Sequence, residues 1–332
     1  MTEKNRSFLI QFIEDLRSFE NVERKKILFP IMDKIRKNSF RSDDIFSDMG
    51  EDAAGIISGD NGDELILLTT DAITEEFSKT SPWAAGFSSI MVCADDISAC
   101  GGIPIAASSI ISSDQPKIRE ELLNGILEAT HRFEIPLIRG HTSDKTSNVG
   151  VSATVIGKIK KEHYISAGGA KAGDEIVIIA DFDGRVGKSS KYFWDTVTYK
   201  SKEELMNKRK LMPQIAQRKI VSASKDVSNG GIFGTLLLLL QYSKKGAIID
   251  LELIQAPAGI INPDFGLSEY VKMYLTSAFL LTLPGSNYEE IKEIGEYYGF
   301  TVFKIGKISE NTQIQFKYKE CTEEFIDLSS YF

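Results

Sequence analysis

The spacing of apolar residues alternates between two periods along the chain and predicts a succession of helices and strands. Apolar side chains recur at helical spacing over residues 8–19, and a second helix is predicted over residues 22–37. After a polar loop, the run ELILLTTDA predicts a strand. The segment that begins at Pro82 is rich in small and apolar residues and predicts a helix that ends at Gly101 and Gly102.

A strand of very small side chains follows at residues 105–113. Apolar residues over 118–127 then mark one face of a helix, and the runs EIPLIRGHTS and VGVSATVIGKI predict two further strands. Because Ala and Ser side chains let another backbone approach closely, we expect the sheet of a second copy to pack here. The sequence therefore predicts a homodimer.

The Gly/Ala-rich segment ISAGGAKAGDEIVIIADFDG marks a boundary, because a turn cluster leads into a new apolar strand. The elements predicted after it are helices at 202–221, from Gly231 onward and at 288–298, and strands at 247–251, 278–283 and 302–307. The predicted fold class is α/β (α+β) with two domains. We expect an N-terminal helical segment at 1–48, an N-terminal domain with a mixed sheet at 49–162, and a C-terminal α/β domain at 163–332.

Composition narrows the classes of partner. The 332 residues carry 47 acidic and 39 basic side chains, a net charge of -8, which disfavours nucleic acid as the main partner. The three cysteines show no paired metal-ligand spacing. The N-terminus lacks the apolar region of a signal peptide, and the longest apolar stretch, 232–240, is too short to span a bilayer. We expect a cytoplasmic protein that does not bind membranes.

Three acidic segments lie in the first hundred residues: GEDAAGI, LLTTDAI and VCADDISACGG. They place Asp52, Asp71 and Asp96 where apolar runs stop. Each could be an ordinary helix cap or turn carboxylate. Carboxylates gathered together repel one another unless cations neutralise them, and Mg²⁺ takes oxygen ligands and then recruits phosphate. With Asp226, they are the predicted metal ligands, and Glu51 and Asp95 are weaker candidates.

Other segments predict contacts to a nucleotide. Asn229, Gly230 and Gly231 precede an apolar helix, whose free N–H groups can receive an anion, although an ordinary capped helix has the same pattern. Gly101 and Gly102 end a helix and would also let backbone approach phosphate.

The turn Gly140-His141-Thr142 contains the one histidine of three that lies in a motif. His exchanges protons near neutral pH, so His141 is predicted as a nucleotide or metal-shell contact, and with Asp96 it forms the predicted catalytic pair. The alternative is a strand-end turn with a hydrogen-bonded histidine.

The segment 185–200 mixes cations with aromatic residues. A solvated loop is one interpretation. The other is a binding segment for an anionic small-molecule acceptor, through Arg185, Lys188, Lys191 and Trp194.

Six segments in this order resemble the superfamily of aminoimidazole ribonucleotide synthetase, selenophosphate synthetase, thiamine-monophosphate kinase and the hydrogenase maturation dehydratase. They are GEDAAGI, TTDA, ADDISACGG, RGHTS, GAKAGDEIVIIA and KDVSNGGIFGTL. The resemblance implies a synthetase-like fold with ATP and Mg²⁺ as cofactors, and it adds Thr70 of TTDA to the nucleotide contacts. The stretch DFDGRVGKSSKYFWDTVTYK is similar to an uncharacterised synthetase-related group that includes a methanogenesis-marker branch.

Differences between this sequence and the motifs of these relatives disfavour some of the reactions that the superfamily catalyses. Residues 1–49 contain no Cys and the chain ends in DLSSYF, which disfavours selenophosphate synthesis and carbamoyl dehydration. Arg139 replaces the first glycine of the family's Gly-Gly-His/Asp-Thr turn, and Ser143 stands where several members have Glu. Phosphate geometry at that turn is therefore expected to differ.

The leading hypothesis is ATP-dependent, Mg²⁺-requiring phosphoryl transfer to a small-molecule acceptor, or ATP-driven activation of it, with kinase-like chemistry favoured. The alternatives are a metal-dependent phosphatase, because clustered aspartates also suit hydrolysis, and a nucleotide-binding regulatory or assembly protein without turnover.

Overall fold

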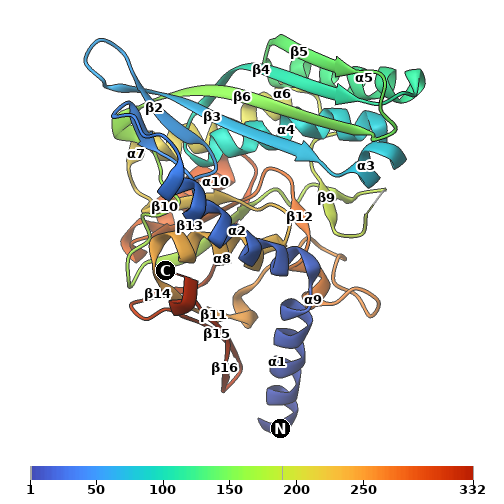
Figure 1. Cartoon of the computed structure of the whole chain (residues 1–332). Coiled ribbons are helices and arrows are strands. Elements are labelled where there is room, and N and C mark those ends of the chain that lie inside the picture. Colours follow the sequence, from blue (N-terminus) through green and yellow to red (C-terminus); the bar gives the residue numbers. More distant parts are fainter. Residues whose placement is uncertain (1, 189, 332) are drawn as a thin grey trace.

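The computed structural model describes residues 2–188 and 190–331, which form two α/β halves, each built on a sheet of its own (Figure 1). The predicted fold class is confirmed by this arrangement. Among the described residues, no helix combines the length and the apolar character needed to cross a membrane.

The N-terminal half contains a mixed sheet. Its elements are β1 (Ile45–Ser47), β2 (Ala54–Ser58), β3 (Glu64–Ile73), α3 (Glu75–Thr80), α4 (Pro82–Ala99), β4 (Ile103–Ser112), α5 (Pro116–Phe133), β5 (Leu137–Ser143) and β6 (Gly150–Lys160). The strand order is β1-β2-β3-β6-β4-β5, in which β4 and β5 pair in parallel and the other neighbours are antiparallel. Along β3, Leu65, Leu67 and Thr69 are buried on the face that α4 covers, because side chains alternate between the two faces of a strand.

The helices α4 and α5 cross at two glycines. A Cβ on Gly86 would lie 2.0 Å from the Leu122 carbonyl oxygen, and one on Gly125 would lie 1.9 Å from the Trp83 carbonyl oxygen. The two backbones are therefore too close for any side chain at these positions. The two helices therefore form one tightly packed layer on a single face of the sheet.

The opposite face of this sheet carries exposed apolar side chains. Leu68, Ile110 and Ile138 are 38%, 49% and 68% exposed, and β5 lies at the end of the strand order. In Figure 1 this face is turned to the top of the molecule, away from α4. It is the face that the small-residue strand predicted for pairing with a second copy.

The C-terminal half is built on a longer sheet, with the order β10-β13-β7-β14-β11-β15-β16, and a small sheet with the order β12-β9-β8. Its strands are β7 (Glu175–Ala180), β8 (Arg185–Val186), β9 (Phe193–Asp195), β10 (Ala223–Asp226), β11 (Gly246–Asp250), β12 (Tyr274–Leu275), β13 (Phe279–Leu283), β14 (Thr301–Ser309), β15 (Gln313–Tyr318) and β16 (Cys321–Asp327). Its helices are α6 (Lys202–Lys208), α7 (Leu211–Arg218), α8 (Gly231–Ser243), α9 (Leu267–Tyr270) and α10 (Tyr288–Tyr297), with 3₁₀ turns at Leu251–Leu253, Gly285–Asn287 and Ser329–Tyr331 and another in the connection between the halves at Lys161–His163. Every residue of β7 is buried, as expected for a central strand covered on both faces.

The two N-terminal helices, α1 (Thr2–Arg17) and α2 (Glu20–Asn38), pack on the C-terminal half. Phe12 of α1 meets Phe233 and Phe316 edge to face, with ring centroids 6.1 and 5.7 Å apart. Arg17 donates a hydrogen bond to the Phe325 carbonyl at 2.9 Å. Although the sequence places these helices before the N-terminal sheet, their apolar side chains belong to the core of the other half.

Some predicted elements differ from the structure. The helix predicted over 202–221 is divided into α6 and α7. Pro213, in the first turn of α7, has no N–H to donate to the Arg209 carbonyl, so one continuous helix is disfavoured. The strands β15 and β16 were not predicted, and the segment interpreted as a loop at 185–200 contains β8 and β9.

Candidate functional site

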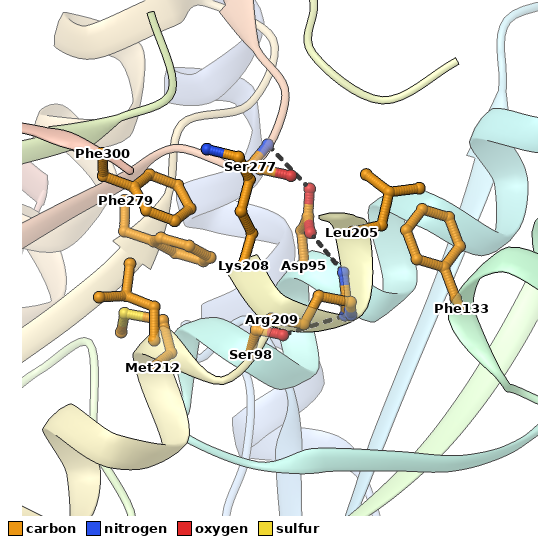
Figure 2. A pocket seen from close by; sticks show the side chains of 11 residues that line it. Asp95, Ser98, Phe133, Leu205, Lys208, Arg209, Met212, Ser277, Phe279 and Phe300 are labelled. Atoms are coloured by element: carbon orange, nitrogen blue, oxygen red, sulfur yellow. Dashed lines mark hydrogen bonds and ion pairs between the residues drawn. The ribbon is translucent and has the colours of Figure 1, made fainter. Parts of the chain in front are cut away.

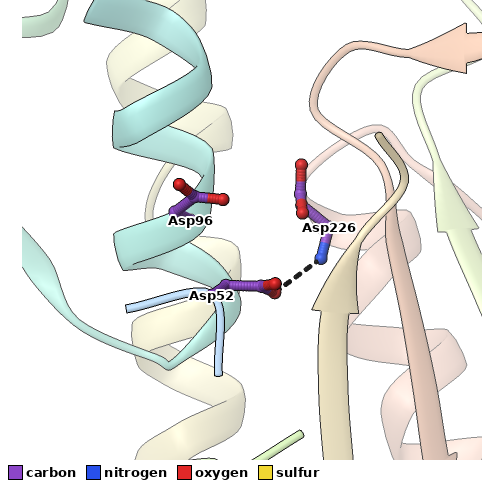
Figure 3. Close-up of side chains that lie close together, drawn as sticks. All are labelled: Asp52, Asp96 and Asp226. Atoms are coloured by element: carbon purple, nitrogen blue, oxygen red, sulfur yellow. Dashed lines mark hydrogen bonds between the residues drawn. The ribbon is translucent and has the colours of Figure 1, made fainter. Parts of the chain in front are cut away.

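Three aspartates from distant segments meet between the two halves. Asp52 lies in the loop before β2, Asp96 in the last turn of α4, and Asp226 at the end of β10. One carboxylate oxygen from each lies within 4.8 Å of the others (Figure 3). The structure thus brings these three side chains together, as the sequence predicted.

Neighbouring groups hold these carboxylates in place. Asp52 Oδ2 accepts a hydrogen bond from the Asp226 backbone N–H at 3.0 Å, which ties the two halves together (Figure 3). Thr69 Oγ1 donates to Asp96 Oδ2 at 2.5 Å. The positions are therefore fixed before any ligand arrives, as expected of a preorganised site.

Asp71 joins the same cluster. It lies on β3, pairs with Ala153 in the sheet register, and its carboxyl group hydrogen-bonds with Asp96. The structure thus brings together all four predicted metal ligands, including Asp52 and Asp226.

The cluster is electrostatically costly without a cation. Burial raises the pKa of Asp96 well above its usual value, and repulsion from Asp226 and Asp71 raises it further. Burial, followed by repulsion from Asp52, acts in the same way on the pKa of Asp226. Asp96 also lies at the C-terminal end of a helix, where the helix dipole disfavours negative charge. A buried set of carboxylate oxygens fits the oxygen coordination that Mg²⁺ prefers.

Two lysines that the sequence analysis missed lie beside the carboxylates. Lys225 forms an ion pair with Asp52. Burial alone would lower the pKa of Lys225, but the Asp52 carboxylate outweighs it and the pKa is raised. Lys25 of α2 donates a hydrogen bond to Ser228 Oγ at 3.1 Å. Burial lowers its pKa, against the attraction of Asp226.

A signal for Lys25 does exist in the sequence. It falls at helical spacing between Val22 and Phe29, the two buried residues of α2, and so lies on the face of the helix that packs inward. A charged residue on such a face needs a polar partner, and the partner is in the distant C-terminal half.

The predicted anion site at Asn229 and Gly230 lies next to Asp226, at the start of α8. Gly230 has a φ of 97°, a left-handed conformation that favours glycine. A Cβ there would lie 3.3 Å from the Asn21 carbonyl oxygen, so the beginning of α2 lies directly over this turn.

The two weaker metal candidates do not join the cluster. Glu51 accepts hydrogen bonds from Ser166 Oγ at 2.6 Å and from the Ala167 N–H at 2.7 Å. Asp95 forms an ion pair with Arg209 at 3.0 Å and accepts from the Ser277 N–H at 3.2 Å (Figure 2). Both carboxylates are engaged in holding the two halves together.

The Asp95–Arg209 pair lines a small cavity of about 10 Å³, large enough for about one water molecule (Figure 2). A larger hollow of about 680 Å³ lies nearby, and Ser98, Phe133 and Arg209 line both. The lining residues of the larger hollow include Ile103, Met206, Gln214 and Tyr298, so it lies between the N-terminal sheet and the α6–α7 segment.

The predicted phosphate approach at Gly101 and Gly102 is not what these residues do in the structure. Their N–H groups donate to the carbonyls of Ser98 and Ile97, at 2.7 and 2.9 Å, and cap α4. A Cβ on Gly101 would lie 2.4 Å from the Cβ of Ala216, so the turn is packed against α7. The helix-ending interpretation accounts for both glycines.

Thr70 and the segment Gly140-His141-Thr142 lie away from the carboxylates, and the predicted turn at this segment is instead part of strand β5. Thr70 is next to Asp71 on β3, so its side chain points to the opposite face of the strand and is exposed. Its hydroxyl hydrogen-bonds with Thr154 Oγ1 at 2.9 Å. His141 lies exposed on β5 opposite Ile110 of β4. The strand order puts β5 three strands from β3, roughly 14 Å. Within one chain, these predicted contacts do not reach the cluster.

The predicted acceptor segment is partly a structural element. Trp194 is 7% exposed, and its indole N–H donates to the Asp181 carbonyl at 2.9 Å, so it is a core residue rather than a ligand contact. Arg185 forms an ion pair with Asp195 at 3.2 Å and lies over the Tyr199 ring. Lys188 and Lys191 are exposed.

Family models match both halves of the chain. The N-terminal domain of AIR synthase related proteins matches residues 50–159, and their C-terminal domain matches residues 171–319. An uncharacterized protein of Methanocaldococcus jannaschii, MJ0640, is 33% identical over 305 residues, which cover 90% of this chain and 91% of that protein.

Two solved structures show the same fold. The structure of AaThiL complexed with AMPPCP and TMP has a TM-score of 0.64 and 21% identity, and covers 90% of this chain and 96% of its own. The structure of T. maritima PurL complexed with ATP has a TM-score of 0.66 and 13% identity over 81% of this chain. The match covers 44% of that PurL chain, so this chain corresponds to less than half of it.

Proposed function

This chain belongs to the AIR synthase related family, and on that premise we propose that it is an ATP-dependent, Mg²⁺-requiring enzyme that transfers a phosphoryl group to a small-molecule acceptor, or activates that acceptor with ATP. The observation that carries the proposal is the meeting of Asp52, Asp96 and Asp226 within 4.8 Å, from segments of both halves.

In this proposal, Asp52, Asp71, Asp96 and Asp226 hold Mg²⁺. The bound metal would neutralise charge on the phosphate oxygens and so let a triphosphate enter an acidic cleft. The backbone N–H groups of Asn229 and Gly230, just before α8, would donate hydrogen bonds to phosphate oxygens. The structures of AaThiL with AMPPCP and of PurL with ATP support this choice of ligand.

We further propose that the open face of the N-terminal sheet pairs with the same face of a second copy. Pairing would cover Ile110 and Ile138. It would also enclose Thr70 and His141, which do not reach the carboxylates of their own chain. We propose that this gives the Gly140–Thr142 segment of β5 a nucleotide contact across the dimer.

The acceptor is proposed to be anionic and to meet Arg185, Lys188 and Lys191. Phe193, in the same segment, lies 6.4 Å from Phe77 of α3 between ring centroids and stacks on Tyr274 at 5.6 Å. The segment therefore borders the N-terminal half. It also lies near the carboxylates, since the pKa of Tyr274 is raised first by burial and then by charges that include Asp226 and Asp96.

The first test is thermal unfolding with AMPPCP and Mg²⁺, compared with AMPPCP and EDTA. Stabilisation is expected with the metal and should disappear in Asp52→Asn and Asp226→Asn. An absence of any metal-dependent stabilisation by the nucleotide would contradict the proposal.

Turnover separates the remaining alternatives. ADP formation that depends on one member of a panel of phosphorylated and carboxylated acceptors is expected. Nucleotide binding with no ADP formed across the panel would favour a regulatory or assembly protein, and phosphate release from a monoester without ATP would favour a phosphatase.

A further inference from the structure

The helix α2 lies outside both family-matched regions, which begin at residue 50, yet it carries Lys25 into the carboxylate cluster. In Figure 1, α2 runs across the front of the molecule between the two halves. The N-terminal segment thus contributes a charged group to a site whose other predicted residues come from the matched domains.

The position of Lys25 is well defined by its contacts. Its Nζ lies 3.1 Å from Ser228 Oγ, and its side-chain carbons pack on the start of α8, where a Cβ on Gly230 or Gly234 would lie 3.5 or 3.8 Å from them. The ammonium also interacts electrostatically with Asp226, Asp52 and Asp71. Lys25 therefore lies where the carboxylates and the proposed phosphate-binding turn meet.

The two lysines of the cluster are engaged differently. Lys225 is committed to its ion pair with Asp52. Lys25 gives a hydrogen bond to a neutral hydroxyl, which takes one of the three N–H donors of the ammonium. The other two N–H donors lie in the field of Asp226, Asp52 and Asp71. A phosphate that reached this point beside a bound metal would compete for them, and a lysine is well suited to phosphate oxygens.

We propose that Lys25 is a catalytic residue of the proposed reaction, whose ammonium donates hydrogen bonds to the phosphate oxygens of the metal-bound nucleotide. This inference rests on the proposed function and adds to it a role for a segment outside the matched domains. In the proposed role, the Lys25 ammonium stabilises negative charge on the phosphate chain.

The proposal has a consequence that a structural role lacks. Lys25 repels a divalent cation that approaches the carboxylates alone, but it attracts the phosphates of a metal–nucleotide complex. Removing its charge should therefore strengthen the binding of the free cation and weaken the binding of the complex. Loss of folding or of local packing would weaken both.

The experiment compares the wild type with Lys25→Met, which keeps an unbranched apolar stem on Gly230, and with Lys34→Met, which removes an exposed charge from the same helix. Binding of Mn²⁺ alone is measured by electron paramagnetic resonance, and binding of Mg²⁺–AMPPCP by titration calorimetry.

In Lys25→Met, Mn²⁺ should bind several-fold more tightly and Mg²⁺–AMPPCP roughly ten- to a hundredfold more weakly, the range expected for loss of a charged hydrogen bond. Lys34→Met should match the wild type. Lys25→Arg, which restores the charge, should return the Mn²⁺ affinity to the wild-type value.

Two failures can be told apart. If the wild type does not bind Mg²⁺–AMPPCP, the proposed function itself is wrong. If the wild type binds it, and Lys25→Met leaves its affinity unchanged or moves both affinities in the same direction, the role of Lys25 is overturned while the proposed function stands.

Discussion

At the scale of single residues, Asp96 combines burial with repulsion from three other carboxylates, so the ligand-free protein carries a cost that a bound metal would remove. Asp96→Asn keeps an oxygen that accepts from Thr69 and removes one charge. We expect the ligand-free variant to gain about 1 kcal/mol, roughly 1–2 °C in melting temperature for a chain of 332 residues, and to lose stabilisation by Mg²⁺ and AMPPCP. Thermal unfolding with and without ligand measures both, and a ligand-free variant less stable than the wild type would contradict the repulsion argument.

Arg209 illustrates a buried charge with a structural task. Its guanidinium donates to Asp95 at 3.0 Å, to the Ala94 carbonyl at 2.6 Å and to Ser98 Oγ at 3.0 Å. Arg209→Met should lower the free energy of unfolding by about 3–5 kcal/mol, because Asp95 would remain buried without its cation. Urea unfolding tests this.

The matched control for Arg209 is Arg218→Met. Arg218 is 58% exposed and lies 3.9 Å from Glu290, an ion pair expected to contribute about 0–1 kcal/mol. If the two substitutions had equal effects on stability, the Asp95–Arg209 pair would not contribute to holding the two halves together.

At the scale of elements, α1 belongs to the C-terminal core through side chains such as Phe12, which is 2% exposed. Phe12→Ala should reduce the free energy of unfolding by about 3–5 kcal/mol, because it opens a cavity against Phe233 and Phe316. Phe8→Ala, at a position 41% exposed, should cost clearly less. Denaturant unfolding of both variants decides whether the helix is a structural part of the core or a loosely attached arm.

At the scale of the whole molecule, the open face of the N-terminal sheet is the surface on which the proposed dimer depends. The wild type is expected to sediment at twice the chain mass of 36.9 kDa. Ile110→Lys, on the β4 strand of this face, should give a monomer, because a charged side chain would be buried without a partner.

Ile261→Lys is the control for this prediction, since Ile261 is 44% exposed in the C-terminal half and Ile110 is 49% exposed. It should leave the mass unchanged. A monomeric wild type at micromolar concentration, or a dimer that survives Ile110→Lys, would rule out pairing through this face.

Local patterns in the sequence determined most of the elements of the N-terminal half, several of the C-terminal half, and the positions of the carboxylates. The apolar spacing of β3, the small-residue helix α4 and the glycine-started helix α8 all follow from interactions within a few residues. The same reason made the four carboxylates predictable, since each one lies where an apolar run ends and side chains point into a cleft. They are Asp52, Asp71, Asp96 and Asp226.

The tertiary structure alone decided what surrounds them. Trp194 and Asp95 looked like candidates for binding, but packing between distant segments buries the first and pairs the second with Arg209. Lys25 gained its place because α2 folds back on the start of α8, about two hundred residues away in the sequence. Such contacts depend on which surfaces meet, and this is set by the burial of apolar faces across the whole chain rather than by any local pattern.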